Sequence, residues 1–270
     1  MHWRRVLAIV RKDLTAVRRS RVLVLPLVLV PFIFFVVLPV ALGILSRTLP
    51  LDARDSEDLS QLVRVLPTRE RERIQALEPS QQLAILLFGY QFAPLLLIVP
   101  LATTTVIAAD GIAGERERRT LEALLVTPIR EDELFLGKLL AAAIPAVGIS
   151  WGGATLSAAL ATLLVGVGPP LLPSVPWLLI AFVGSPAVAL LGLGVIVLIS
   201  SRVRGMQEVS QLSGLVALPI IGLLVAQSSG LVLLDWRLTL VACAVLWALA
   251  GIVLRVGRRS FQREALLRFG

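Results

Sequence analysis

The sequence predicts an all-α integral membrane protein with six transmembrane helices. Of its 270 residues, 57% are apolar and only 16% are charged, whereas an ordinary soluble domain is about half apolar and about a quarter charged. Charged residues are absent from four long runs, 22–46, 83–109, 139–201 and 209–234. A helix needs about 20 apolar residues to cross the hydrocarbon core, and the third run is long enough for two crossings. These runs exclude a soluble enzyme, a fibrous protein and a disordered chain.

The rest of the composition excludes several kinds of site. Cys243 is the single cysteine and His2 the single histidine, so we predict no disulfide framework, no metal centre and no histidine proton relay. A membrane β-barrel is disfavoured, because its strands alternate over about ten residues. In a soluble protein, a net charge of +8 would be consistent with binding of nucleic acid. In a membrane protein it is typical of basic cytoplasmic segments, so we expect no nucleic-acid partner.

Residues 2–19 precede the first span and predict a basic amphipathic helix. One face carries apolar side chains at steps of three and four, namely Trp3, Val6, Leu7, Val10, Leu14 and Val17. Arginine and lysine occupy much of the remainder. Such a helix, with a tryptophan on its apolar side, is typical of a segment lying in the membrane interface.

The expected spans follow the apolar runs in order. They are 22–46, 83–109, 139–165, 177–200, 209–227 and 238–255. The glycine and proline cluster 166–170 marks the loop that divides the 63-residue run. The polar segments are 47–82, 110–135 and the basic tail 256–270. We therefore expect residues 1–270 to form one transmembrane domain.

The charge distribution predicts the orientation of these spans. Segments on the side of the N-terminus sum to +9, and those on the other side sum to −1. Because basic residues in short loops stay in the cytoplasm, we expect both termini and the segment 110–135 to be cytoplasmic. The segment 47–82 then lies outside the cell membrane.

The most informative polar stretch is 114–138, whose pattern predicts a helix, a turn and a second helix. Glu115 and Glu117 place negative charge in the first turn, where the helix dipole favours it. Leu121, Leu124 and Leu125 form one apolar ridge. Thr127-Pro128 ends the first helix, and the acidic residues 131–133 open the next. The acids could serve only as caps and the arginines only as lipid anchors, but the leucine ridge needs a cover from the bilayer, this chain or a partner.

This stretch resembles the cytoplasmic loop of type-2 ABC transporter permeases, which reads E-R-E-x-G-T-L-E-x-L-L-x-T-P with G-K about ten residues later. The matching residues are Glu115, Arg116, Glu117, Thr120, Leu121, Glu122, Leu124, Leu125, Thr127, Pro128, Gly137 and Lys138. Arg119 stands where the family usually has glycine. The basic N-terminal helix, the six spans and the turn from Arg202 to Glu208 resemble the family's layout as well.

The resemblance implies that residues 114–127 are a coupling helix that docks on a separate ATP-hydrolysing subunit of an exporter. The residues expected to make this contact are Glu115, Glu117, Thr120, Leu121, Glu122, Leu124, Leu125, Thr127 and Pro128. It also implies that two permease subunits pair in the cell membrane. The N-terminal helix is expected to pass on the motion of the ATPase.

No nucleotide site is expected in this chain. A phosphate-binding loop needs a glycine, four residues, then Gly-Lys and a hydroxyl residue. Before the single Gly-Lys pair, 137–138, Asp132 replaces the first glycine, and Leu139 follows in place of the hydroxyl. ATP therefore belongs to the partner subunit, and the chain itself is expected to be no enzyme.

The spans carry no ionisable residue between their ends, which disfavours a proton-coupled secondary carrier. Gly148 and Gly152 form a G-x-x-x-G pattern that allows close helix contact on the third span. A second interpretation stays open, in which the chain is a non-transporting membrane scaffold that recruits a cytoplasmic partner through 114–127. The sequence does not indicate the transported substrate.

Overall fold

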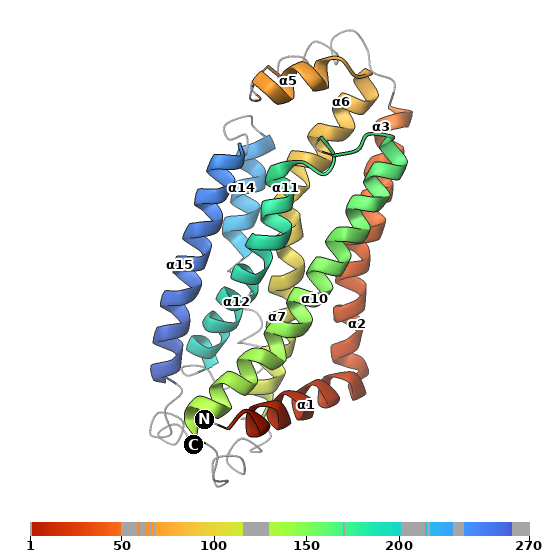
Figure 1. Ribbon diagram of the computed structural model, residues 1–270. Coiled ribbons are helices and arrows are strands. Elements are labelled where there is room, and N and C mark those ends of the chain that lie inside the picture. Colours follow the sequence, from red (N-terminus) through yellow and green to blue (C-terminus); the bar gives the residue numbers. More distant parts are fainter. Residues whose placement is uncertain are drawn as a thin grey trace.

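The computed structural model describes residues 2–49, 59, 63, 64, 66, 68–115, 130–169, 171–200, 214, 217–228 and 235–260. These residues form an elongated bundle of helices, with α1 lying across one end (Figure 1). The α-helices are α1 (Trp3–Arg19), α2 (Arg21–Phe32), α3 (Leu38–Thr48), α5 (Thr68–Gln75), α6 (Pro79–Ile85), α7 (Ile98–Ala108), α10 (Glu131–Val165), α11 (Val175–Leu179), α12 (Ser185–Ser200), α14 (Leu218–Ser228) and α15 (Trp236–Ser260). No strand occurs among the described residues, so the all-α prediction is confirmed for that part of the chain.

Five continuous helical segments are long and apolar enough to cross a membrane. They are Arg21–Thr48, Pro79–Ile112, Glu131–Val165, Val175–Ser200 and Trp236–Arg258, and they contain the first four predicted spans and the last one. Of the predicted fifth span, 209–227, residues 209–213, 215 and 216 lie outside the described residues, and α14 covers 218–227. The count of six spans therefore stays a prediction.

Short turns of π-helix or 3-10 helix join the α-helical pieces within three of these spans. The π-helical turns are Ile33–Val37, Leu86–Gln91, Ala109–Gly114 and Ile180–Gly184, and the 3-10 turn is Ala93–Leu97. Pro31 and Pro39 flank the first π-helical turn, and Pro94 lies in the 3-10 turn. Proline has no N–H for the regular helical pattern, and such local changes of pattern keep the helix continuous.

The second span, Pro79–Ile112, forms the centre of the bundle. Of its most apolar stretch 72% is buried, against 17% for the first and for the last span. Phe88 and Phe92 lie edge-on to each other within the core. The first and last spans expose many large apolar side chains, among them Val22 and Val241, as expected for surfaces that face lipid.

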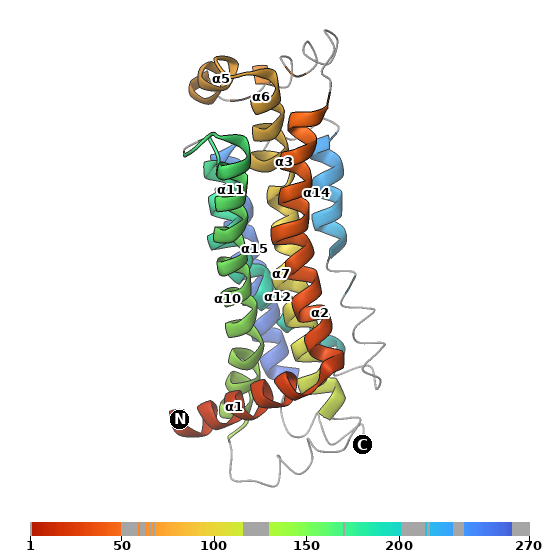
Figure 2. The same ribbon diagram turned by 90° about the vertical axis from the view of Figure 1, so that its right-hand side faces the viewer.

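The predicted N-terminal helix is present as α1, which runs across the end of the bundle in both views (Figures 1 and 2). Ser20 has an extended backbone and ends it before α2 begins. The single predicted apolar face is wrong in part, because α1 has two apolar edges. Val6, Val10 and Val17 pack inward with Ile9, whereas Trp3 and Leu7 are more than half exposed.

The longest helix, α10, begins at Glu131 and ends at Val165. Its acidic first turn and its stop at the predicted 166–170 loop agree with the sequence pattern. Gly166 has a φ of +75° and donates its N–H to Thr162 O at 2.9 Å. Glycine adopts this left-handed conformation at little cost, which explains why the helix ends there.

The glycines of α10 differ in what surrounds them. A Cβ added at Gly153 would lie 1.9 Å from the ring of Phe35 on the first span, but one added at Gly148 or Gly152 would meet nothing within 4 Å. Close helix contact within this chain is thus made by Gly153. The predicted pair Gly148 and Gly152 instead lies on an open face of α10.

We expect Gly153→Ala to destabilise the protein by about 1–3 kcal/mol, because the new methyl group overlaps Phe35. Gly152→Ala is the matched control, with an expected change within about 0.5 kcal/mol. Unfolding of both variants in the same detergent measures the difference. Equal stabilities would contradict the close packing of Gly153 against the first span.

Candidate functional site

Four charged side chains meet at the end of the bundle that α1 covers. Lys12 and Asp13 come from α1, Glu115 follows the second span, and Lys138 lies in the second turn of α10. Asp13, Glu115 and Lys138 are each at most 6% exposed. Buried charges of this kind need direct partners, and these residues supply them to one another. We call this set the α1 ion cluster.

Lys138 holds the centre of the α1 ion cluster. Its Nζ lies 2.9 Å from Asp13 Oδ2 and 2.6 Å from Glu115 Oε2. Lys12 also donates to Glu115 Oε1 and lies 3.3 Å from Asp13 Oδ1. Each carboxylate therefore contacts both ammonium groups. The two positive and two negative charges balance, so the cluster is neutral as a whole.

Helical spacing on α1 brings Asp13 to this position. Val6, Ile9, Val10, Asp13 and Val17 are its buried residues, and they follow one another at steps of one, three and four along one face. Gly137 lets this face approach α10, because a Cβ there would lie 2.8 Å from the side chain of Ile9. Because Lys138 follows Gly137 in α10, this close approach of the two helices places Asp13 beside Lys138.

Lys12 is the member of the α1 ion cluster that reaches the surface, with its side chain 45% exposed. Burial alone would lower the pKa of Lys12, but the hydrogen bond and charge of Glu115, together with Asp13, raise the pKa above its ordinary value. The raised pKa stabilises the folded state below about pH 10.5, the ordinary lysine value, and this contribution is lost only as the pH rises through the folded-state pKa. Lys12 is therefore charged at physiological pH.

A second buried carboxylate anchors the start of α1. Glu133, in the first turn of α10, is fully buried. It accepts a hydrogen bond from the backbone N–H of His2 at 2.6 Å and one from that of Arg130 at 3.3 Å. The guanidinium of Arg5 lies 3.6 Å from Glu133 Oε2. The N-terminal turn of α1 is thereby held to the first turn of α10.

The last helix is joined to the same end of the bundle by a more exposed pair. Arg258 of α15 lies 2.8 Å from Asp132 of α10, and both side chains are about half exposed or more. An exposed pair contributes about 0–1 kcal/mol. The pair therefore adds little to the attachment that the buried groups provide.

The contacts of the α1 ion cluster run between helices. In the part of the chain that the structure describes, no group of three or more His, Cys, Asp or Glu side chains could hold a metal ion. Each carboxylate of the cluster is occupied by lysine. The arrangement fixes α1, the end of the second span and the start of α10 relative to one another.

The predicted site residues fall into three groups. Glu115 is described, and its carboxylate lies in the α1 ion cluster. Glu117, Thr120, Leu121, Glu122, Leu124, Leu125, Thr127 and Pro128 lie outside the described residues. Gly148 and Gly152 lie on the open face of α10.

Sequence reasoning did not identify Asp13 or Glu133 as buried partners. A signal existed for Asp13, since it is an acid at the helical spacing of Val6, Val10 and Val17 on an otherwise basic helix. For Glu133 the pattern indicated only a helix start. Its partner is the backbone of His2, 131 residues away, which no local pattern predicts.

We expect Lys138→Met to lower the free energy of unfolding by about 3 kcal/mol, the lower part of the range for breaking a buried ion pair. Lys12 remains to partner both carboxylates, which limits the loss. Adding Asp13→Asn removes the one uncompensated negative charge, leaves Lys12 paired with Glu115 and should restore most of the stability. The measurement is the unfolding of all variants in one detergent.

Arg258→Met is the matched control, because it breaks an exposed ion pair to the same helix. Its expected cost is about 1 kcal/mol or less. If Lys138→Met is no more harmful than Arg258→Met, the α1 ion cluster does not stabilise this end of the bundle.

The sequence matches a known protein family over most of its length. A family model described as ABC-2 family transporter protein matches residues 7–233. No protein of curated function matches. The matched region begins within α1, includes all three elements of the α1 ion cluster and ends before α15. The family is a family of membrane permeases of ABC transporters. Since the match covers most of the chain, this protein belongs to the ABC-2 transporter permease family.

Proposed function

We propose that this permease is the membrane subunit of an ATP-driven exporter and is coupled to a separate ATPase subunit through residues 114–127. The observation that supports the proposal is the ion pair between Glu115 and Lys138, at 2.6 Å. Glu115 is the last described residue before 116–129, and Lys138 lies in the helix that follows. The pair therefore joins the residue before segment 116–129 to the helix after it, and the family resemblance implies that this segment belongs to the coupling helix.

A force on this segment would reach three elements together. Lys138 also binds Asp13. A displacement of Glu115 or Lys138 would therefore be shared by α1, the second span and α10. The second span is the most buried of the five, which makes it a suitable carrier of the motion into the bundle. ATP binding would act by favouring one of two arrangements through its differential affinity.

The docking contacts would come from the part of the segment beyond Glu115. Because Glu115 is bound by two lysines, we assign the docking surface to Leu121, Leu124 and Leu125. Glu117, Thr120 and Glu122 would lie at the rim, and Thr127-Pro128 would end the helix. The sequence contains no phosphate-binding loop, so ATP would be hydrolysed on the partner alone.

The surface of the bundle suits a multi-pass protein of the cell membrane that works as a dimer. The exposed Trp3 and Leu7 of α1 would lie in the cytoplasmic interface of the bilayer. Gly148 and Gly152 would be available to lipid or to a second permease subunit, identical or different. Both termini would be cytoplasmic, and transport would run outward.

Truncating Leu121 and Leu125 to alanine should weaken docking of the ATPase by about 2–4 kcal/mol, because a buried leucine contributes about 1.5–3 kcal/mol. The spans are unchanged, so the variant should still insert and fold. Co-purification of the ATPase subunit and transport are the measurements, and both should be lost together.

Arg118→Ala is the control: we propose that Arg118 is exposed, so its loss should cost about 1 kcal/mol or less. The isolated permease, without its partner, is expected to hydrolyse no ATP. Retention of the ATPase by the double leucine variant would refute the docking surface. A wild-type complex that hydrolyses ATP without transport would favour the scaffold interpretation.

The orientation can be tested with single cysteines in a Cys243→Ser background. A cysteine at Ser56 should react with an impermeant thiol reagent in intact cells, whereas a cysteine at Arg118 should react only after the cells are opened. The expectation rests on the charge difference of +9 against −1. The opposite labelling pattern would reverse the orientation.

A further inference from the structure

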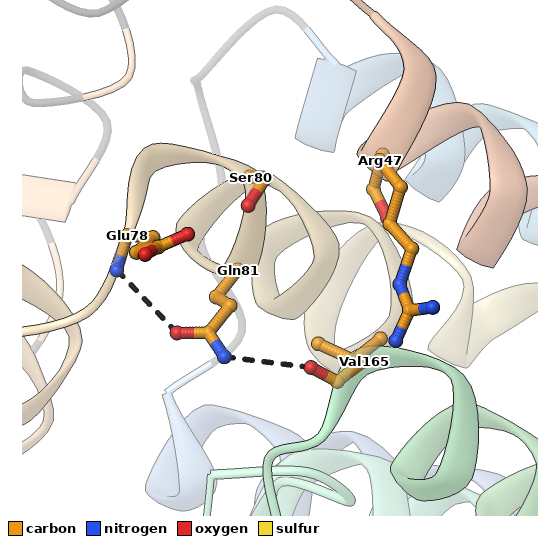
Figure 3. A pocket seen from close by; sticks show the side chains of 6 residues that line it. Arg47, Glu78, Ser80, Gln81 and Val165 are labelled. Atoms are coloured by element: carbon orange, nitrogen blue, oxygen red, sulfur yellow. Dashed lines mark hydrogen bonds between the residues drawn. The ribbon is translucent and has the colours of Figure 1, made fainter.

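A polar pocket lies at the end of the bundle opposite to α1. It is lined by Ser46, Arg47, Glu78, Ser80, Gln81 and Val165, and its volume is about 250 Å³. The lining comes from the end of α3, the start of α6 and the end of α10 (Figure 3). This volume is below the range of about 300–1,000 Å³ that is usual for drug-sized ligands, so the pocket suits a small polar group.

The pocket presents one positive and one negative side chain. Arg47 and Glu78 are both exposed, and Figure 3 shows them on different sides of Gln81. Neither makes an ion pair with another residue in the described ranges. Their charges are therefore available to a ligand that carries both signs.

The neutral part of the lining is fixed by hydrogen bonds. Gln81 donates from Nε2 to Val165 O at 3.4 Å, and its Oε1 accepts from the Glu78 N–H at 3.4 Å (Figure 3). Ser46 is 1% exposed and donates to Gly43 O at 3.0 Å. A hydroxyl oxygen that donates once can still accept, so Ser46 offers a buried acceptor at the pocket.

Apolar side chains precede Arg47 on the same face of the first span. Ile44, three residues before Arg47, is 52% exposed, and Val37, seven residues before Ile44, is 43% exposed. Arg47 follows them at the end of a 28-residue apolar span, where basic side chains reach the headgroup region. A molecule with a charged head and apolar chains would match this sequence of surfaces.

We propose that this pocket binds the headgroup of a phospholipid that carries phosphoethanolamine. Arg47 binds the phosphate through its guanidinium, as arginine commonly does. Glu78 and the acceptor oxygens of the lining bind the ammonium N–H groups, and the acyl chains lie along Ile44 and Val37. Choline offers no N–H donor, and a purely anionic headgroup leaves Glu78 without a positive partner. The inference is independent of the proposed ATPase coupling.

The test uses the full chain, purified in detergent without its ATPase and stripped of lipid. Phosphatidylethanolamine, phosphatidylcholine and phosphatidylglycerol with identical acyl chains are titrated, and bound lipid is counted by native mass spectrometry. Wild type should bind phosphatidylethanolamine about tenfold more tightly than the other two, the effect of one charge-assisted hydrogen bond.

The variants separate the two charges. Arg47→Gln should weaken phosphatidylethanolamine binding about tenfold, and Glu78→Gln should remove the preference for it over phosphatidylglycerol. Arg73→Gln is the matched control, since Arg73 is an exposed arginine of α5 that does not line the pocket. Both pocket charges are exposed, so these variants should fold; their thermal unfolding in detergent checks this.

Three results would overturn the proposal. One is equal binding of the three lipids by wild type. Another is a loss in Arg73→Gln as large as that in Arg47→Gln. The third comes from soluble phosphoethanolamine and inorganic phosphate as competitors: if either displaces the lipid at equal concentration, the pocket recognises a free phosphate compound and not a membrane lipid. Because no ATPase is present, these outcomes leave the proposed transport function untouched.

Discussion

The ion pairs that Lys138 makes with Asp13 and Glu115 hold together elements that are far apart in the sequence. Separating any of the three would leave a charge in a site from which water is nearly excluded, and such a charge costs several kcal/mol. The amphipathic helix, the end of the central span and the start of α10 are consequently bound as one unit. Glu133 strengthens it by accepting the N–H of His2.

The two ends of the bundle use charge differently. At the α1 end, buried carboxylates are paired with lysines of the same chain, and the arrangement of the helices depends on these pairs. At the opposite end, Arg47 and Glu78 line a pocket at the surface. The buried Tyr90 also donates its hydroxyl to Glu70 of α5 there, which meets the need of a buried phenol for a partner and attaches α5 to the central span.

Between these two ends, close packing at glycine residues holds the helices of the bundle together. Gly153 admits the ring of Phe35, Gly192 lies against Leu101, and Gly194 approaches Val253 of α15. Lipid is as apolar as a leucine side chain, so helices in a membrane associate through close packing more than through hydrophobic burial. The exposed apolar surfaces of the first and last spans, which would promote aggregation in water, can remain in contact with lipid.

The sequence by itself determined the elements. Charge-free runs identified the spans that the structure describes, the acidic residues 131–133 marked a helix start, and Gly166 marked its end. The loop motif at 114–138 is sufficient to indicate the family. The tertiary structure alone decided which faces meet: that Asp13 and Glu115 share Lys138, and that Gly153 packs while Gly148 and Gly152 do not. Periodicity tells which residues share a helix face, but lipid and the protein interior are equally apolar, so hydropathy cannot distinguish the face that packs from the face that meets the membrane.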